Sequence, residues 1–185
     1  MFGLELKRHR EEILKQVNFC SAYTRAPWRL TVWEHLYIFA RIYEADNPKR
    51  RADEMLEAFH LTKQRRVLIG DLSSGNIARL NLCKAFINEP RLVLMDEPTS
   101  SLDPDIADRV RDFIKRKTKD HKTTILLASH NMEEIEEMCD RVIFMNRGKI
   151  VAENTPEELA KQSKRNQGGK PTLADYFIGE ARDED

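Results

Sequence analysis

The chain has 185 residues, 41% of them hydrophobic and 34% charged, and its formal net charge is zero because 31 Lys and Arg balance 31 Asp and Glu. This length allows one domain with a sizeable core, and the balanced charge argues against broad electrostatic binding to nucleic acid or to an anionic membrane. The three cysteines have none of the short spacings typical of zinc sites or disulfide frameworks, which fits a reducing cytosol.

The first sixty residues predict helices around one short strand. Residues 7–16 read as a charged amphipathic helix, and the apolar run 17–20 predicts a buried strand. A helix that begins at a threonine cap is expected over 31–43, and another around 52–59. Residues 31–60 are therefore expected to form a compact helical region.

Aromatic residues gather in and just before this helical region. Most of these rings are expected to form the region's own core. Trp28, which stands between Pro27 and Arg29 in a predicted loop, is the best candidate for an exposed ring that a partner protein contacts.

From residue 72 onward helices and strands alternate along the chain. Continuous apolar strands that alternate with helices indicate a mostly parallel sheet covered on both faces. The segment 146–148 is a turn signal, after which 149–152 is expected to return as a hairpin strand, and a further helix begins after Thr155. The elements expected before this turn are helices over 74–88, 105–118 and 132–138, and strands over 92–95, 123–128 and 142–145.

An apolar strand that ends in two acids carries the strongest chemical signal. Residues 92–95 are Leu-Val-Leu-Met, and Asp96 and Glu97 follow directly. A buried parallel strand readily carries carboxylates at its C-terminal edge, where open α/β sheets bind their ligands. There Asp96 would hold Mg²⁺, and Glu97 would polarise the water that attacks a γ-phosphate. The alternative is a pair of solvated acids at a strand end.

A loop with two serines and a glycine precedes the helix expected over 74–88. Ser73, Ser74, Gly75 and Asn76 stand at its start. A glycine without Cβ lets an anion approach the backbone, and the first turn of a helix presents unpaired N–H groups and a partial positive charge. Phosphate is a natural ligand for such a loop, although a plain helix cap accounts for the same residues.

Asp103 ends the segment Ser-Leu-Asp that follows the two acids closely. In a functional role it would orient groups across a subunit interface. The alternative is an N-cap for the helix that starts near Pro104.

His130 follows the strand expected over 123–128. This order predicts that it lies at the same edge of the sheet as Asp96 and Glu97. A histidine beside those acids can donate a hydrogen bond to a γ-phosphate, whereas a lone histidine is more often structural.

The order and spacing of these motifs resemble those of the ATP-binding cassette (ABC) ATPases. The resemblance includes the flanking segments 88–91 and 96–99. It covers nearly the whole chain, because 30–34 looks like the segment after the family's Q-loop and 172–178 resembles the tail of exporter-type members. It implies an α/β fold, an incomplete P-loop NTPase fold with a mostly parallel sheet and a helical subdomain over about 31–90.

The resemblance implies two sets of site residues that serve different nucleotides. In the family two nucleotide-binding domains meet head to tail, and each ATP lies between the Walker A loop of one domain and the signature motif of the other. Carried over, the signature residues Ser73, Ser74, Gly75 and Asn76 would contact ATP held by the opposite subunit.

The strand-end residues would instead serve the ATP of their own subunit. By resemblance Asp96 binds Mg²⁺, and Glu97 and His130 act catalytically on that ATP. Asp103 joins them as a catalytic residue at the interface.

The main departure from the family is a missing phosphate-binding loop. A Walker A motif reads Gly-x-x-x-x-Gly-Lys-Ser/Thr, so that backbone N–H groups surround the phosphates and a lysine reaches the β and γ oxygens. Neither the Gly-Lys pair at 148–149 nor the pair at 169–170 has the first glycine or the following hydroxyl. The chain is therefore expected to be N-terminally shortened, and to bind ATP and Mg²⁺ only with a complementing partner.

A smaller departure lies at the Q-loop. The family's glutamine falls near Ala22, and no adjacent side chain offers a carboxamide. Some exporter branches resemble this chain in lacking that glutamine. Asn76 in place of the signature glutamine is a milder change.

Together these features predict the ATP-hydrolysing subunit of an ABC exporter, which is inactive alone in this form. Its expected partners are a membrane-spanning transporter subunit and a second nucleotide-binding domain, with no nucleic acid. The expected location is cytoplasmic, at the inner face of the membrane through that subunit.

Residues 1–160 are expected to form the truncated ATPase domain, and 161–185 a tail with a short helix. The alternative is a non-catalytic interaction module that lends its signature motif to a partner ATPase.

Overall fold

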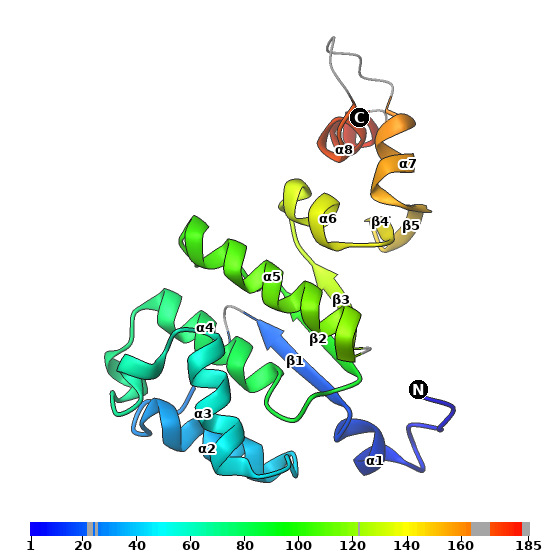
Figure 1. The fold of residues 1–185 in the computed structure, drawn as a ribbon. Helices are drawn as coiled ribbons and strands as arrows, with labels where there is room; N and C mark the ends of the chain where they lie inside the picture. Colours follow the sequence, from blue (N-terminus) through cyan, green and yellow to red (C-terminus); the bar gives the residue numbers. More distant parts are fainter. Residues whose placement is uncertain (22–23, 25, 122, 164–170, 183–185) are drawn as a thin grey trace. The chain divides into compact units, whose positions relative to one another are not determined.

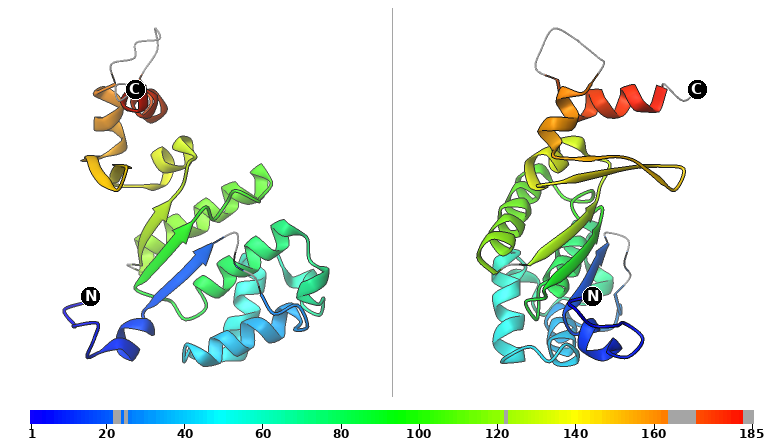
Figure 2. Two further views of the ribbon diagram at one scale, coloured as in Figure 1. Left: turned by 180° about the vertical axis from the view of Figure 1, so that it is seen from behind. Right: turned by 90° about the vertical axis from the view of Figure 1, so that its right-hand side faces the viewer.

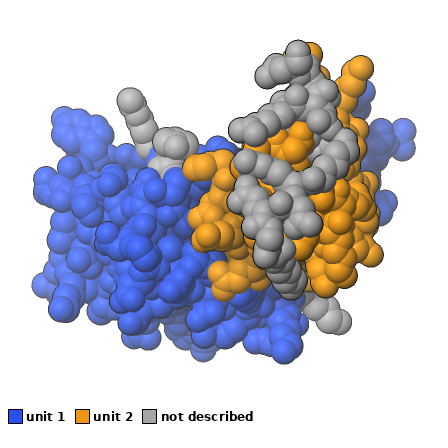
Figure 3. All heavy atoms as spheres, turned by 90° about the horizontal axis from the view of Figure 1, so that it is seen from above, with its two compact units in different colours: residues 1–128 blue, residues 129–185 orange. Residues whose placement is uncertain are grey.

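Two compact units make up the chain, residues 1–128 and residues 129–185, coloured separately in Figure 3. The computed structural model describes residues 1–21, 24, 26–121, 123–163 and 171–182. None of the helices in these ranges is long and apolar enough to cross a membrane.

A three-stranded parallel sheet forms the centre of the first unit (Figure 1). Its strands, in spatial order, are β1 (Val17–Ser21), β2 (Leu92–Asp96) and β3 (Thr124–Ala128). The register pairs Ser21 with Asp96 and Asp96 with Ala128, so the carboxyl ends of all three strands reach one edge together. The three strands expected from the apolar runs are thus confirmed.

Helices α4 (Ser74–Ala85) and α5 (Pro104–His121) are the crossovers between these strands, and Figure 2 shows α5 beside the sheet. They lead from β1 to β2 and from β2 to β3, in the same direction across the sheet. Right-handed crossovers that run in one direction place their helices on one face. On that face Cys20, Val93 and Met95 are buried.

The opposite face of the sheet is not covered by the residues that the structure describes. Phe19, Leu94 and Leu126 form one cross-strand row on it, and Phe19 and Leu126 are 51% and 60% exposed. We call this row the open sheet face. The expectation of a sheet covered on both faces is wrong for this part of the chain, because both crossovers run the same way.

A helical region lies between β1 and α4 in the sequence. It contains α2 (Val32–Ile42), α3 (Pro48–Ala58) and two short 3₁₀ helices (Thr62–Gln64 and Ile69–Asp71), whereas a short α1 (Arg10–Leu14) precedes β1. The Thr31 hydroxyl accepts a hydrogen bond from the Glu34 N–H at 3.2 Å, and the Glu34 carboxylate accepts from the Thr31 N–H at 2.9 Å. This capping box begins α2 at the expected threonine.

The aromatic rings of this region divide between core and surface. Phe59 is buried, and its ring centroid lies 4.7 Å from that of Phe113 on α5. Trp28 is 65% exposed, with the Arg29 guanidinium 4.6 Å from its ring centroid. The expectation that Trp28 lies at the surface is confirmed.

The second unit combines a hairpin with three helices in its described residues. Its elements are α6 (Met132–Met138), β4 (Val142–Asn146), β5 (Lys149–Asn154), α7 (Pro156–Lys161) and α8 (Leu173–Arg182). Strands β4 and β5 pair antiparallel, as the turn signal predicts, in a two-stranded sheet of their own. Leu159, Leu173 and Tyr176 form the buried core between the last two helices.

His35 on α2 is a buried polar residue with an unusual environment. Its side chain is 2% exposed, and its ring centroid lies 4.7 Å from that of Phe39. Neither ring nitrogen has a hydrogen-bond partner. Burial, and to a lesser degree the nearby charge of Lys84, lower the pKa of His35 to about 4. His35 is therefore neutral in the folded state at pH 7.

We predict that stability falls below about pH 6.5. The unfolded chain protonates His35 near its ordinary pKa, whereas the folded chain does so only near pH 4, so the stability present above pH 6.5 is lost as pH falls between these values. His35 should account for a loss of about 2 kcal/mol on going from pH 7 to pH 5. Urea denaturation of wild type and His35→Leu at both pH values measures this.

The exposed His9 provides the matched control, because His9→Gln leaves the buried His35 in place and should keep the loss that His35 causes. An equal loss in wild type and His35→Leu would contradict the prediction.

Candidate functional site

Asp96 lies at the carboxyl end of β2, where its side chain is exposed. The Ser21 hydroxyl, at the end of β1, donates a hydrogen bond to Asp96 Oδ2 at 3.3 Å. This bond orients a carboxylate oxygen at the open edge of the sheet. Sequence reasoning missed Ser21, because its place opposite Asp96 depends on the strand register.

Glu97 follows β2 with a left-handed backbone, at φ +49°. Its N–H donates to the Ala128 carbonyl at 2.9 Å, which ties the end of β2 to the end of β3. Residues other than glycine rarely adopt this conformation, and such strain clusters at functional sites. Asp96 is exposed and Glu97 is half-buried, so the two adjacent acids have different surroundings.

The signature residues begin α4. The Ser73 hydroxyl accepts a hydrogen bond from the Asn76 N–H at 3.3 Å and so caps the helix. Ser73 and Ser74 are exposed, whereas Gly75 and Asn76 are half-buried. The Asn76 side-chain oxygen accepts from the guanidinium of Arg79 on the next turn. The capping interpretation of this loop is thus confirmed for Ser73, and the side chains of Ser73 and Ser74 are still exposed.

Gly75 lies against the segment that carries Asp103. A Cβ added to Gly75 would lie 3.2 Å from the Ser101 carbonyl oxygen, so a larger residue here pushes on that backbone. The Asp103 side chain is exposed, and its carbonyl accepts from the Ala107 N–H at 2.8 Å, in the N-cap position of α5. The fold therefore brings together two motifs that are 26 positions apart in the sequence.

His130 belongs to the second unit, where its side chain is exposed. It lines a hollow of about 310 Å³ with one polar neighbour, Ser129, and four apolar ones, Met132, Ala174, Phe177 and Ile178. Its place beside Asp96 and Glu97 stays a prediction. The Q-loop position at Ala22 lies outside the described residues.

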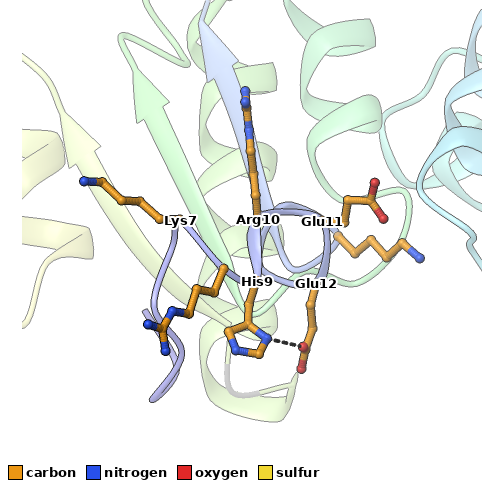
Figure 4. Close-up of a pocket in the computed structure, with 7 residues that line it drawn as sticks. Lys7, His9, Arg10, Glu11 and Glu12 are labelled. Atoms are coloured by element: carbon orange, nitrogen blue, oxygen red, sulfur yellow. Dashed lines mark ion pairs between the residues drawn. The ribbon is translucent and has the colours of Figure 1, made fainter.

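A larger hollow, of about 510 Å³, lies at the N-terminal helix α1 (Figure 4). Its lining is charged, and two of the lining residues form an ion pair, with His9 Nδ1 3.5 Å from Glu12 Oε2. None of the predicted site residues lines it.

The strand-end residues fit a Mg²⁺ ion that is coordinated by one or two protein carboxylates. Mg²⁺ prefers oxygen ligands and is commonly held by one or two carboxylates together with phosphates and water. Asp96 supplies an exposed carboxylate, and Ser21 is the outer partner that orients it. Among the described residues no three His, Cys, Asp or Glu side chains gather into a metal site of their own.

Comparison with known proteins identifies relatives of this chain. Residues 21–136 match the model of a family described as AAA domain, putative AbiEii toxin, Type IV TA system. The chain is 32% identical over 145 residues to a probable amino-acid ABC transporter ATP-binding protein of Sinorhizobium fredii, covering 74% of this chain and 56% of that protein. It is 40% identical over 133 residues to a fluoroquinolones export ATP-binding protein of Mycobacterium tuberculosis, covering 71% of this chain and 42% of that protein.

The fold of the chain is also found in solved structures. A structure of the ATP-binding subunit of an ABC transporter has a TM-score of 0.83 and 24% identity, over 96% of this chain and 73% of that chain. The chain spans about half the length of the curated relatives it matches.

The cap of α4 yields a stability prediction. Ser73→Ala removes the acceptor of the Asn76 N–H and should lower the free energy of unfolding by about 1 kcal/mol. Ser74→Ala, one position inside the helix, leaves that cap in place and introduces a better helix former, so it should not lower the free energy of unfolding. Urea denaturation at pH 7 compares the two variants, and equal losses would show that the Ser73 cap does not stabilise the helix.

Proposed function

Because this chain belongs to the AAA-domain family and has the fold of ABC transporter ATP-binding subunits, we propose that it is the ATP-hydrolysing part of an ABC transporter of the exporter type. The observation that carries this proposal is the arrangement at the carboxyl edge of the sheet. There Asp96 is exposed and accepts a hydrogen bond from Ser21, and Glu97 follows it with a left-handed backbone whose N–H donates to the Ala128 carbonyl.

Each strand-end residue takes one role in hydrolysis. Asp96 holds Mg²⁺, which when bound neutralises charge on the β- and γ-phosphates. Glu97 accepts a proton from the attacking water, since a carboxylate at this edge is a suitable general base. His130 donates a hydrogen bond to the γ-phosphate. Asp103 orients groups at the subunit interface.

The signature residues act on the nucleotide of a second domain. Ser73 and Ser74 are exposed at the positive end of the 12-residue helix α4, which suits them to bind phosphate that another chain presents. Gly75 and Asn76 complete this surface. A head-to-tail dimer of nucleotide-binding domains is therefore the working assembly, as the family resemblance implies.

A membrane-spanning subunit is the other partner that we propose. The exposed Trp28 and its stacked Arg29 offer an aromatic and cationic contact on the helical region. Attachment there would hold the chain at the inner face of the membrane.

The hydrogen bonds that a Walker A loop makes to the ATP phosphates must be supplied by residues other than these 185. No Gly-x-x-x-x-Gly-Lys-Ser/Thr motif occurs among them. Such a loop supplies several charge-assisted hydrogen bonds, each worth about 1.5–3 kcal/mol. Without it ordinary micromolar affinity is lost. The 185 residues should therefore need a complementing phosphate loop before they bind ATP.

We expect isothermal titration of the 185-residue chain with Mg-ATP to show no stoichiometric binding, and a phosphate-release assay to show no steady hydrolysis.

In the assembled transporter, Glu97→Gln should lower kcat about 100-fold or more with little change in ATP affinity, because it removes the general base. Glu57→Gln, an exposed acid on α3, is the matched control and should leave kcat unchanged. Tight ATP binding by the isolated chain, or full activity of Glu97→Gln, would refute the proposal.

A second candidate function is supported by the signature loop, in which Ser73 and Ser74 are exposed. The chain would then be a non-catalytic interaction module that docks on a partner ATPase and contributes Ser73 and Gly75 to the partner's nucleotide. Here Glu97→Gln should have no effect on the partner's hydrolysis rate.

Gly75→Asp tests this second function. A carboxylate there repels phosphate and presses on the Ser101 carbonyl, so the variant should abolish any change that the chain causes in the partner's ATPase rate. Titrating the variant into the partner's steady-state assay measures this, with Glu57→Gln again as the control. An unaltered response to Gly75→Asp would exclude the module.

A further inference from the structure

The segment that carries His130 is closed by a ring of hydrogen bonds. The Ser129 hydroxyl donates to Glu134 Oε2 at 3.0 Å and accepts from the Asn131 N–H at 3.1 Å. The Asn131 side-chain oxygen accepts from the Glu134 N–H at 3.2 Å. These bonds join the residues on either side of His130 to the first turn of α6, so the backbone of His130 is fixed from both sides.

Glu134 is buried, whereas glutamates in the same helix position elsewhere are exposed. Its side chain is 2% exposed. Glu34 in α2 and Glu158 in α7 are also the third residue after a capping residue, and both are exposed. Burying a carboxylate costs free energy unless hydrogen bonds compensate for the lost water. A plain cap would not need this burial.

The Glu134 carboxylate also has a different partner from those two. Glu34 and Glu158 accept from the hydroxyl of the capping threonine itself. Glu134 instead accepts from Ser129, which stands two positions before the capping Asn131. The Glu134 carboxylate therefore bonds to a residue outside the helix, and Ser129 is the residue directly before His130.

The His130 side chain remains exposed while its backbone is held. The ring lines the hollow formed with Met132 and Phe177, and Glu134 anchors the segment from the buried side. A side chain on a segment fixed in this way is oriented before a ligand arrives, which lowers the cost of reaching the reactive geometry.

We infer that Glu134 is a positioning residue for His130, and that its buried carboxylate, acting through Ser129, holds the 129–131 segment in the conformation in which the imidazole meets the nucleotide. The inference rests on the role of His130 in the proposed function. It assigns Glu134 no contact with substrate.

The kinetic test uses the assembled transporter. Glu134→Leu removes the acceptor at nearly the same volume, and kcat should fall about tenfold or more while KM for ATP changes less than about twofold. Glu134→Gln keeps an acceptor oxygen for Ser129, so kcat should stay within about twofold of wild type. Glu158→Leu, at the same helix position in the same unit, should leave kcat unchanged.

A double-mutant cycle tests the route through Ser129. Ser129→Ala should lower kcat as Glu134→Leu does, and the double variant should be no slower than the slower single variant, because both remove the same bond. Additive losses would overturn the inference. A loss with Glu134→Gln equal to that with Glu134→Leu would also overturn it, since the acceptor is then irrelevant.

A spectroscopic test on the 185-residue chain separates this inference from the proposed function. The ring carbon–proton NMR signals of His130 should be a single sharp set in wild type and Glu134→Gln, and should broaden or split in Glu134→Leu and Ser129→Ala. Unchanged signals would refute the positioning role. If His130→Ala left kcat intact while the signals still responded to Glu134→Leu, the proposed role of His130 would fail and the positioning would stand.

Discussion

The parallel pairing of β1, β2 and β3 is the constraint on which the candidate site depends. Backbone hydrogen bonds fix the register, and the register brings Ser21, Asp96 and Ala128 to the same edge. The Ser21 to Asp96 hydrogen bond and the link from Glu97 to Ala128 both follow from it. A register shift by one residue would turn the Asp96 carboxylate to the other face, so the chemistry of the edge requires this alignment.

The polar groups at the starts of α4 and α6 are oriented in one case by a local cap and in the other by a buried side chain. At the start of α4 the cap is local, since Ser73 and Asn76 are neighbours in the sequence. At the start of α6 a buried glutamate reaches across the cap to Ser129. Both arrangements fix the backbone while the Ser74 and His130 side chains stay exposed, and a fixed backbone under exposed side chains suits a binding site.

Much of the fold could be predicted from the sequence, because apolar runs and caps are local signals. The strand before Asp96, the capped helix after Thr31 and the hairpin near residues 146–148 were all predicted. The contact between Gly75 and Ser101, the left-handed Glu97 and the role of Ser21 were not, since they depend on contacts between distant segments. The place of His130 beside the acids stays a prediction.

The open sheet face has a consequence for how these residues persist in a cell. Phe19 and Leu126 present an apolar surface on strands with no helix above them in the described structure. Molecular chaperones and quality-control proteases recognise unshielded apolar segments of this kind. The polypeptide would therefore be degraded unless another segment or protein covers the open sheet face soon after synthesis.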